Sequence, residues 1–290
     1  MCFEVMAMNS AKRGPRITFF VAAAAFVALL VIERRRPLRK RREPEVRRVA
    51  RNAGLGAVAA VVTAALEIPL LAPAARKIEA RRLGLIHQLP LPRPVRIAAG
   101  VLLLDYTLWW WHWMNHTVPF LWRFHLVHHV DLDLDASTAL RFHFGEMALS
   151  VFFRAAQFRI LGIAPAAAAL WQTALFVSIL FHHSNTRLGD AVERRLSHLI
   201  VTPRMHGIHH STVRGETDSN WSSLLSWWDF LHGTFRLDVP QDAITIGVPA
   251  WQDPRELTLG RILAMPFRRQ RDDWDATARF REPSPPSPRA

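Results

Sequence analysis

Most of the 14 histidines in this 290-residue chain lie in small groups, and most of these groups follow long apolar runs. The groups, with one single residue between them, are His112 and His116; His125, His128 and His129; His143; His182 and His183; and His206, His209 and His210. Neutral imidazole is a common ligand of iron, zinc and copper. Because one ion takes about four to six ligands, this many histidines call for two ions. The pattern predicts a membrane protein with a dinuclear, histidine-rich metal centre.

Composition supports a membrane protein. Half of the residues are hydrophobic, 11 are tryptophan, and the formal net charge is +13. In a soluble protein such a charge would suggest nucleic acid, but no nucleic-acid-binding pattern accompanies it, and we expect no such partner. Residues 33–51 hold ten Lys or Arg against three Glu between two apolar runs, which is typical of a cytoplasmic loop beside membrane spans. Cys2 is the only cysteine, so the metal chemistry must rest on histidine.

Five apolar runs organise the chain. They are 17–32, 53–75, 95–111, 147–161 and 165–181. The first follows basic residues as a signal peptide would, but it ends in Glu33 and three arginines without a small-residue cleavage site, so we interpret it as a first span or signal anchor. Arg154 and Arg159 make the fourth run a poor lone span, so it is expected to lie partly in the interface or against protein. The last two runs predict a helical hairpin.

The runs predict an all-α, integral-membrane helical bundle with a cytoplasmic, histidine-rich metal-binding cap. If 33–51 is cytoplasmic, the alternating spans place every histidine group on the cytoplasmic side, in what we expect to be a bacterial inner membrane. We divide the chain into an N-terminal span with its basic loop (1–52), a membrane-embedded metal domain (53–238) and a cytoplasmic tail (239–290). The Pro- and Ser-rich stretch at 283–288 is predicted to be disordered.

The spacing inside the histidine groups fits helices. His112 and His116 are four residues apart, which places both on one helix face, near enough to share an ion. His125 shares a face with His128 and with His129, whereas those two neighbours diverge by about 100° and can reach toward two ions. The group at 206–210 repeats this arrangement. A single pair also fits interfacial histidines that face water, but a plain surface does not produce the whole combination.

Other polar residues are weaker candidates. His143 is either a ligand or a hydrogen-bonded partner, and His182 beside His183 leaves open which of the two binds metal. Asp105 lies two helical turns before His112 on the same face and is a candidate for orienting a ligand. The remaining candidates for such outer contacts are Asn185, Glu146, Asp218, Asn220 and Asp229. We interpret the isolated His87, His198 and His232 as ordinary polar or core residues.

The order of these motifs resembles the fatty acid hydroxylase/sterol desaturase superfamily over roughly residues 33–235. The resemblance rests on His112-x3-His116, His125-x2-His128-His129, His183-Ser184-Asn185 and His206-x2-His209-His210, supported by Asp105, Trp122, Arg141-Phe142-His143 and Trp228-Asp229-Phe230. The chain departs from the family pattern at Trp113-Met114-Asn115, at Asn220-Trp221-Ser222 and at His232, which puts any transfer of substrate identity in doubt.

The resemblance implies a histidine-ligated di-iron centre that uses O2 and two electrons to hydroxylate or desaturate a sterol-like or fatty acyl lipid. It adds His183 to the ligands that spacing selects, for a full set of His112, His116, His125, His128, His129, His183, His206, His209 and His210. The sequence has no Gly-x-Gly-x-x-Gly nucleotide fingerprint, so a separate reductase, ferredoxin or cytochrome is the expected electron donor. The alternative is a non-catalytic membrane metal-binding protein. The His-Glu-x-x-His motif that a zinc hydrolase would need is absent from this sequence. A haem carrier would place its histidines between the spans rather than beyond them.

The topology can be tested with reporter fusions. Fusions at Arg51 and Arg236 are expected to report the cytoplasm, because the basic loop sets the orientation of the spans, and a fusion at Arg93 is expected on the opposite side. Activity of the Arg236 fusion outside the cytoplasm would contradict a shared side for the histidine groups.

Overall fold

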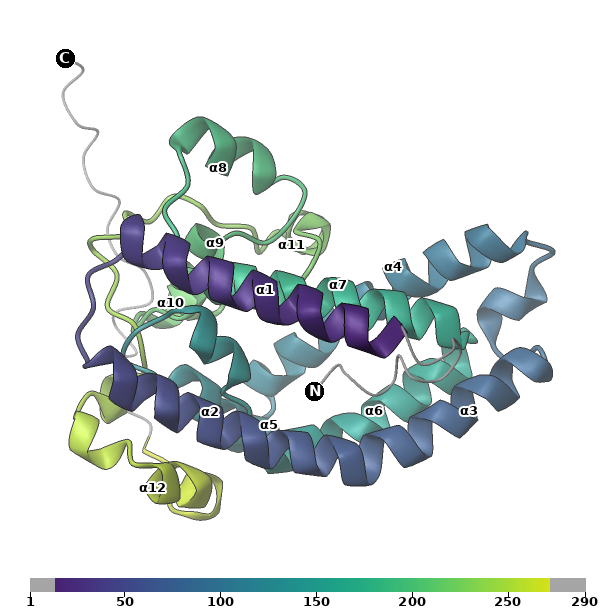
Figure 1. Ribbon diagram of the computed structural model, residues 1–290, viewed down its shortest axis with the longest axis horizontal. Helices are drawn as coiled ribbons and strands as arrows, with labels where there is room; N and C mark the ends of the chain where they lie inside the picture. Colours follow the sequence, from purple (N-terminus) through teal and green to yellow (C-terminus); the bar gives the residue numbers. More distant parts are fainter. Residues whose placement is uncertain (1–13, 272–290) are drawn as a thin grey trace.

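A computed structural model describes residues 14–271, and these residues form helices with no β-strand among them, only isolated bridges. The predicted all-α class is therefore confirmed for this part of the chain; the Pro- and Ser-rich stretch lies outside the described residues. The long helices run roughly side by side (Figure 1). They are α1 (Gly14–Arg35), α2 (Glu45–Val62), α3 (Ile68–Ala80), α4 (Arg93–Thr117), α6 (Phe144–Leu161) and α7 (Pro165–His183).

Each apolar run of the sequence lies in one of these long helices, except the run 53–75, which extends over two of them. Run 53–75 is carried by α2 and α3, which a π-helical turn at Thr63–Glu67 joins into one continuous rod. Pro69 sits at the start of α3 directly after that turn, where the hydrogen-bond ladder is already rearranged, so it does not end the rod. By length and composition, two segments of the described chain could cross a membrane: Glu45–Gln88 and Pro165–His183.

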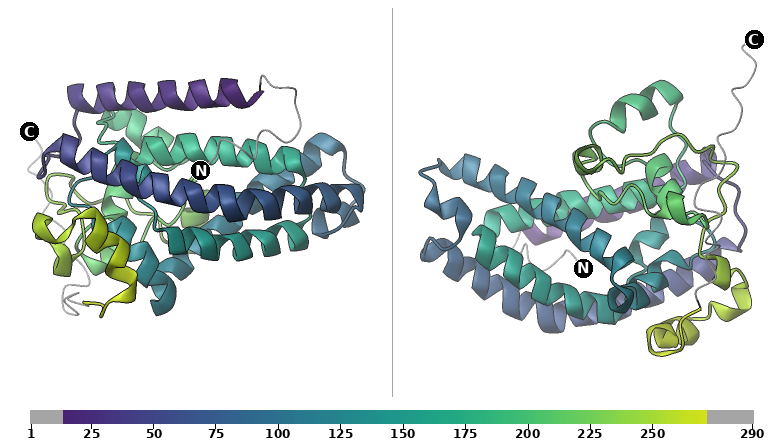
Figure 2. Two further views of the ribbon diagram at one scale, coloured as in Figure 1. Left: turned by 60° about the horizontal axis from the view of Figure 1, so that its bottom comes forward. Right: turned by 180° about the vertical axis from the view of Figure 1, so that it is seen from behind.

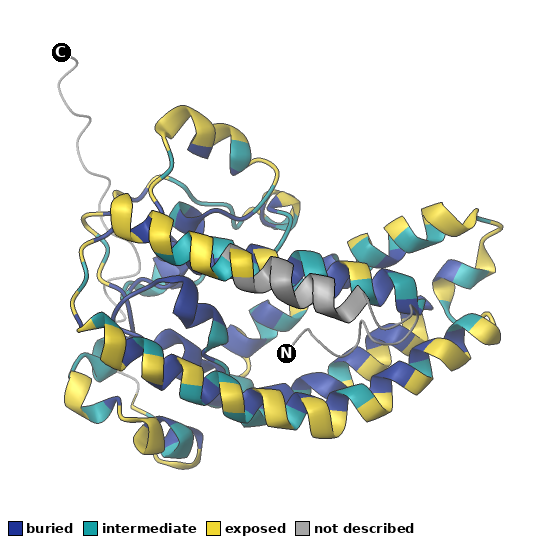
Figure 3. Cartoon of the chain, viewed as in Figure 1, coloured by how far each residue is buried: buried dark blue, intermediate teal, exposed yellow. Residues whose placement is uncertain are grey.

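Short helices gather at one end of this bundle. They are α5 (Pro119–His129), α8 (Asp190–Leu196), α9 (Pro203–His209), α10 (Arg214–Thr217), α11 (Trp227–His232) and α12 (Leu259–Ala264), with single 3-10 turns at Ala136–Leu140, Pro249–Trp251, Pro254–Glu256 and Met265–Phe267. A further 3-10 turn at Leu85–Gln88 lies between α3 and α4, at the opposite end of the bundle. Figure 2 shows α1 on the outside of the molecule beside α7. The stretch from 124 to 139 and the helix α9 are almost entirely buried (Figure 3). The end of the molecule richest in histidine is thus also the most deeply enclosed.

Two apolar cores hold the fold together. One joins α3, α4, α6 and α7 and includes Leu71, Leu104 and Trp171. The other lies beneath the histidine groups, where Leu55 of α2 and Leu126 of α5 meet Ile262 of α12. Residues 246–267 thus return to the bundle and cover the outer side of α5.

A close backbone contact seals the opposite end of the bundle. Gly162 ends α6 with a left-handed φ of +84° and packs on Gly84, whose φ is +91°. A Cβ at Gly84 would lie 2.3 Å from the Gly162 nitrogen, so the contact requires glycine.

A buried ion cluster fixes the chain just after α5. Asp131 accepts hydrogen bonds from Arg48 at 2.8 Å and from Asn52 at 3.0 Å, both on α2, and it also contacts Arg51 and Arg141. Burial alone would raise the pKa of the Asp131 carboxyl, but the charges of Arg48, Arg141 and Arg51 lower it below its ordinary value. Asp131 therefore stays ionised and ties α2 to the end of α5.

Replacing Asp131 with Asn is expected to destabilise the fold strongly, by about 3–5 kcal/mol, because the buried Arg141 loses the one carboxylate that lies within ion-pair distance of it among the described residues. Arg48 and Arg51 keep Asp135 and Glu43 as partners. Thermal unfolding in detergent, followed by circular dichroism, measures the change. The matched control is Asp253→Asn, which breaks the exposed pair with Arg255 and is expected to leave the Tm near wild type. Equal effects of the two changes would contradict this role for Asp131.

Candidate metal centre

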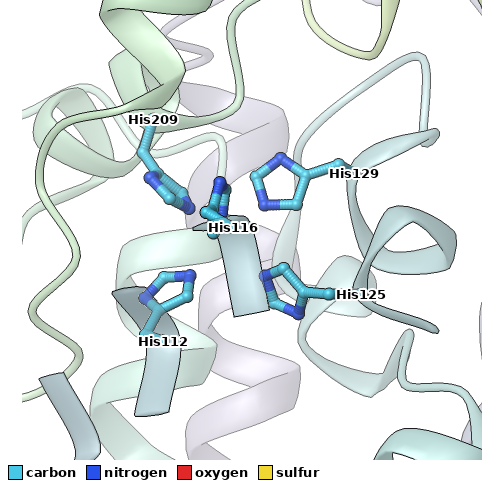
Figure 4. Close-up of side chains that lie close together, drawn as sticks. All are labelled: His112, His116, His125, His129 and His209. Carbon is cyan, nitrogen blue, oxygen red and sulfur yellow. The ribbon is translucent and has the colours of Figure 1, made fainter. Parts of the chain in front are cut away.

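The structure brings all nine predicted ligands together in two neighbouring groups. Within each group the potential ligand atoms lie within 4.8 Å of one another, and every one of the nine side chains is buried. The first group, drawn in Figure 4, contains His112, His116, His125, His129 and His209. The second contains His128, His183, His206 and His210. Their role as metal ligands remains our proposal; their convergence is an observation.

Helix geometry explains how each group forms. His112 and His116 lie on one face of the last turns of α4, which ends when Val118 adopts an extended backbone. Pro119 then starts α5, which packs against α4 and returns His125 to the same place. The adjacent His128 and His129 point to different groups, as their 100° separation on a helix requires.

The second pair of neighbours divides in the same way. Thr202 caps the N-terminus of α9 and Pro203 occupies its first turn, so the helix begins at a fixed residue. His206 follows one turn later, and His209 and His210 then reach the first and second group respectively. Because α5 and α9 each contribute to both groups, the two groups are fixed relative to each other.

The second group has the spacing of ligands around one ion. The Nε2 atom of His183 lies 3.1 Å from Nε2 of His128 and 2.9 Å from Nε2 of His206, which in turn lies 3.1 Å from Nε2 of His210. Two nitrogens bound at right angles to one ion, each about 2.1 Å away, stand about 3 Å apart. Four imidazoles facing each other in this way fit a divalent cation.

The first group shows the same need for a cation. In Figure 4 the imidazole rings of its five histidines surround a common point. The Nε2 atoms of His116, His125, His129 and His209 are buried and have no hydrogen-bond partner in the protein. Burying such nitrogens is costly unless something binds their lone pairs. Imidazole sets of this kind suit iron, zinc or copper.

Hydrogen bonds on the far side of the rings set the tautomer of several candidate ligands. Nδ1 of His112 donates to the Trp221 carbonyl at 2.7 Å, and Nδ1 of His209 donates to the Ser219 carbonyl at 2.8 Å. A carbonyl can only accept, so Nδ1 carries the proton and Nε2 keeps a lone pair for metal.

The same arrangement holds around the second group. Nδ1 of His183 donates to the Ile179 carbonyl at 2.8 Å, and Nδ1 of His128 donates to the Arg141 carbonyl at 3.1 Å. Arg141 itself donates from Nε to the Val127 carbonyl and contacts Asp131, so the ion cluster beside α5 supports His128 indirectly.

A carboxylate orients one ligand. Oε1 of Glu146, in the first turn of α6, lies 3.1 Å from Nδ1 of His125. Such a contact fixes the ring and increases the basicity of its other nitrogen. Asp229 acts one step further out: it accepts from the backbone N–H of Trp221, whose carbonyl holds His112.

Four of the buried histidines that lie outside the long helices are neutral at pH 7. Burial first, and neighbouring histidines second, lower the pKa of His129, His206 and His210 well below the ordinary value. Burial also lowers the pKa of His209 to about 3. Only neutral imidazole binds metal, so this environment prepares the rings as ligands.

The four secondary candidates differ in position. His182 is buried with its ring centroid 4.2 Å from that of His206, but it belongs to neither group. His143 lies apart: it accepts from the Gly145 N–H and its Nε2 donates to the Leu263 carbonyl, so it caps α6. Asp105 accepts hydrogen bonds from Trp228 at 2.7 Å and from the Leu225 backbone N–H, and it forms none with a histidine in the described part of the chain. Asn185 binds the backbone of Arg39 through both side-chain atoms.

An apolar cavity opens beside both groups, between α4, α6 and α7. Its wall includes His112 and His125 from the first group and His128, His183 and His206 from the second. Most of the remaining wall is hydrophobic, with Leu108, Trp111, Phe142, Met147, Phe153 and Leu175. The arrangement can hold an apolar molecule with one atom close to the histidines and water excluded from the site.

The sequence comparisons point the same way. The sequence model of fatty acid hydroxylases matches residues 97–234, the region that holds all nine histidines. The chain is 30% identical over 184 residues to the ornithine lipid hydroxylase OlsE of Rhizobium tropici, covering 62% of this chain and 52% of that protein. It is 28% identical over 153 residues to the human alkylglycerol monooxygenase, covering 53% and 33%.

A third relative is a cholesterol 25-hydroxylase-like protein of Danio rerio, 30% identical over 145 residues, covering 49% of this chain and 56% of that protein. The chain thus spans about half or less of the length of these relatives. No solved structure matches it.

The site separates ligands from bystanders in a testable way. His209→Ala is expected to abolish activity and lower bound metal, because the imidazole lies in the first group and its Nε2 faces the other rings. His87→Ala is the control: this histidine lies in the 3-10 turn at Leu85–Gln88, beside the glycine contact at the opposite end of the bundle. The metal content and turnover of the His87→Ala variant are expected to match wild type. Equal loss in both variants would refute the assignment.

Proposed function

Because residues 97–234 match the fatty acid hydroxylase family, we propose that this chain is a membrane-bound, O2-dependent lipid hydroxylase with a di-iron centre. One observation carries the proposal. Two groups of buried imidazoles, both formed in part by α5 and α9, line the wall of one apolar cavity. The relatives named above are hydroxylases or monooxygenases, which favours hydroxylation over desaturation. We propose a sterol-like or fatty acyl substrate.

Iron fits the donor set, because imidazole suits iron and the two groups together supply nine nitrogens. When bound, two irons supply the activation of O2 that insertion into an unactivated C–H bond needs. The reaction balances as a lipid R–H with O2, two electrons and two protons, giving R–OH and water. A separate donor protein is proposed to deliver the electrons, since the sequence offers no cysteine set and no nucleotide fingerprint for a second redox group.

The residues of this chain perform the remaining tasks. The apolar wall made by Leu108, Phe142 and Phe153 excludes water and holds the chain of a lipid. Glu146 keeps His125 in place. We propose that the site faces the cytoplasm of a bacterial inner membrane, as the basic loop at 33–51 indicates. A protein that only stores or senses metal is the alternative, but such a role has no use for an apolar cavity beside the histidines.

Lipid mass spectrometry tests the proposal. Membranes containing the wild-type chain are supplied with ornithine lipid, alkylglycerol or cholesterol under ¹⁸O2, with a ferredoxin and its reductase as electron source. The expected product carries one added ¹⁸O atom, and His128→Ala, which removes a ring of the second group, is expected to give none. Loss of two hydrogens would show desaturation instead. Iron-loaded wild-type protein that modifies no lipid of the panel or of the host membrane would overturn the proposal.

A further inference from the structure

A buried ion pair lies among the apolar faces of the long helices. Arg154 of α6 donates from Nη1 to Oε1 of Glu67 at 2.7 Å, and both side chains are at least nine-tenths buried. Glu67 belongs to the π-helical turn within Glu45–Gln88, one of the segments long and apolar enough to cross a membrane. Charged residues at such depth are costly and mark functional sites, and π-helical turns occur often at such sites.

One member of the pair, Arg154, reaches the apolar cavity beside the histidines. Arg154 lines that cavity together with Gln157 and Trp171, and its guanidinium carbon lies 5.6 Å from the centre of the Trp171 ring. Gln157 is fixed by a 2.6 Å hydrogen bond from its Nε2 to Thr107. The cavity therefore has a metal-ligand end and a polar end, with hydrophobic walls between them.

Arg154 also lines a second cavity, between α2 and α7. Phe142, Leu175 and Ile179 are shared by the two cavities, and Gly56 and Ala59 form the α2 side of the second one. Arg154 and these three residues therefore stand at the boundary between the two cavities. The guanidinium is thus placed to contact whatever occupies the space beside the histidines.

Helix geometry sets the distance between the two ends. Glu146, which contacts His125, and Arg154 are eight residues apart on α6, which corresponds to about 12 Å along the helix axis. A group held at Arg154 would therefore fix which atom of the same molecule lies near the histidines.

The charge of the Arg154–Glu67 pair determines which kind of chemical group can bind beside it. Guanidinium carries five N–H donors, and Glu67 accepts from only one nitrogen of Arg154 in this structure. Since Glu67 already balances the positive charge, a second carboxylate or a phosphate would add an uncompensated buried negative charge. A neutral oxygen acceptor, such as a hydroxyl or an ester or amide carbonyl, fits instead.

We propose that Arg154, assisted by Gln157, is a substrate-positioning site that binds a neutral oxygen of the lipid and so selects the carbon that is hydroxylated. The role of the site in catalysis rests on the proposed hydroxylase function. Binding of the lipid oxygen does not, because it needs neither O2 nor electrons.

The test combines binding with product position. Arg154→Gln combined with Glu67→Gln removes the guanidinium without leaving a lone buried carboxylate, whereas Arg154→Lys keeps a charged donor. Arg159→Gln is the matched control, because Arg159 lies on the same helix and is exposed. Lipids of the panel named above are titrated without O2 by tryptophan fluorescence. The hydroxyl position and KM are then determined for each lipid that is turned over.

In the double variant the Kd and KM are expected to rise about tenfold, as for loss of one hydrogen bond, and the hydroxyl is expected on several carbons. Arg154→Lys should retain most of the wild-type position, and Arg159→Gln should match wild type. If the double variant binds no metal or unfolds, the wild-type protein is given an analogue in which the lipid oxygen is replaced by CH2. A mixture of hydroxyl positions from the analogue supports the proposal.

A single, unchanged hydroxyl position together with an unchanged KM, in the double variant or with the analogue, would overturn the inference. Failure of the proposed function looks different: the lipid binds wild-type protein about tenfold more tightly than the double variant, yet no oxygenated product forms. In that outcome the binding site stands while the hydroxylase function does not.

Discussion

The structure depends on the burial of nine imidazole rings in one place. Several of these rings have a nitrogen that is buried without a hydrogen-bond partner in the protein, and burial of unpaired nitrogens is costly. Such a cluster costs least when the rings are neutral and their lone pairs face a common point that a cation can occupy. Both conditions hold here: burial lowers the pKa of His129 and His210, and the Nε2 atoms of each group face one another. The surrounding helices serve this arrangement.

Outer layers keep the rings in position. Backbone carbonyls at Trp221, Ser219, Ile179 and Arg141 each hold one ring by its Nδ1 atom. Behind them lie charged and polar residues that do not touch the rings, with Asp229 beneath Trp221 and the ion cluster of Asp131 beside Arg141. Because these supports come from α2, α7 and the segments after α9, the histidine groups are held by the whole fold. The cavity lies between α4, α6 and α7, each of which has one terminus beside the histidines.

Sequence reasoning predicts the parts of this arrangement that local rules control. Apolar runs set the helices α4, α6 and α7 nearly to their ends, and helical spacing explains why His128 and His129 serve different groups. It does not show that α2 and α3 form one rod, because Pro69 is tolerated directly after the π-helical turn and Pro73 lies inside α3 without ending it. The packing of residues 246–267 under α5 was equally hidden, since short mixed segments carry no clear period.

Within the site, the sequence could not reveal contacts made by the backbone. Asp105 was a reasonable candidate to orient a ligand, being two turns before His112, but its carboxylate accepts from Trp228 instead. The carbonyl groups that hold the rings are backbone groups, so the side chains of those residues do not reveal them. Asp131 supports His128 indirectly through Arg141, and no sequence spacing indicates this link. Pairs such as Glu67 and Arg154 are distant in sequence, so only the packing of α6 against the α2–α3 rod brings them together.

The most direct measurement of the central claim is the number of metal ions in each chain. Protein is purified in detergent from iron-replete cells and analysed for iron, zinc and copper, with quantitative amino-acid analysis for the chain. Two groups of neutral imidazoles predict about two irons per chain. A stoichiometry near one metal, or zinc that persists in iron-replete cells, would contradict the di-iron account.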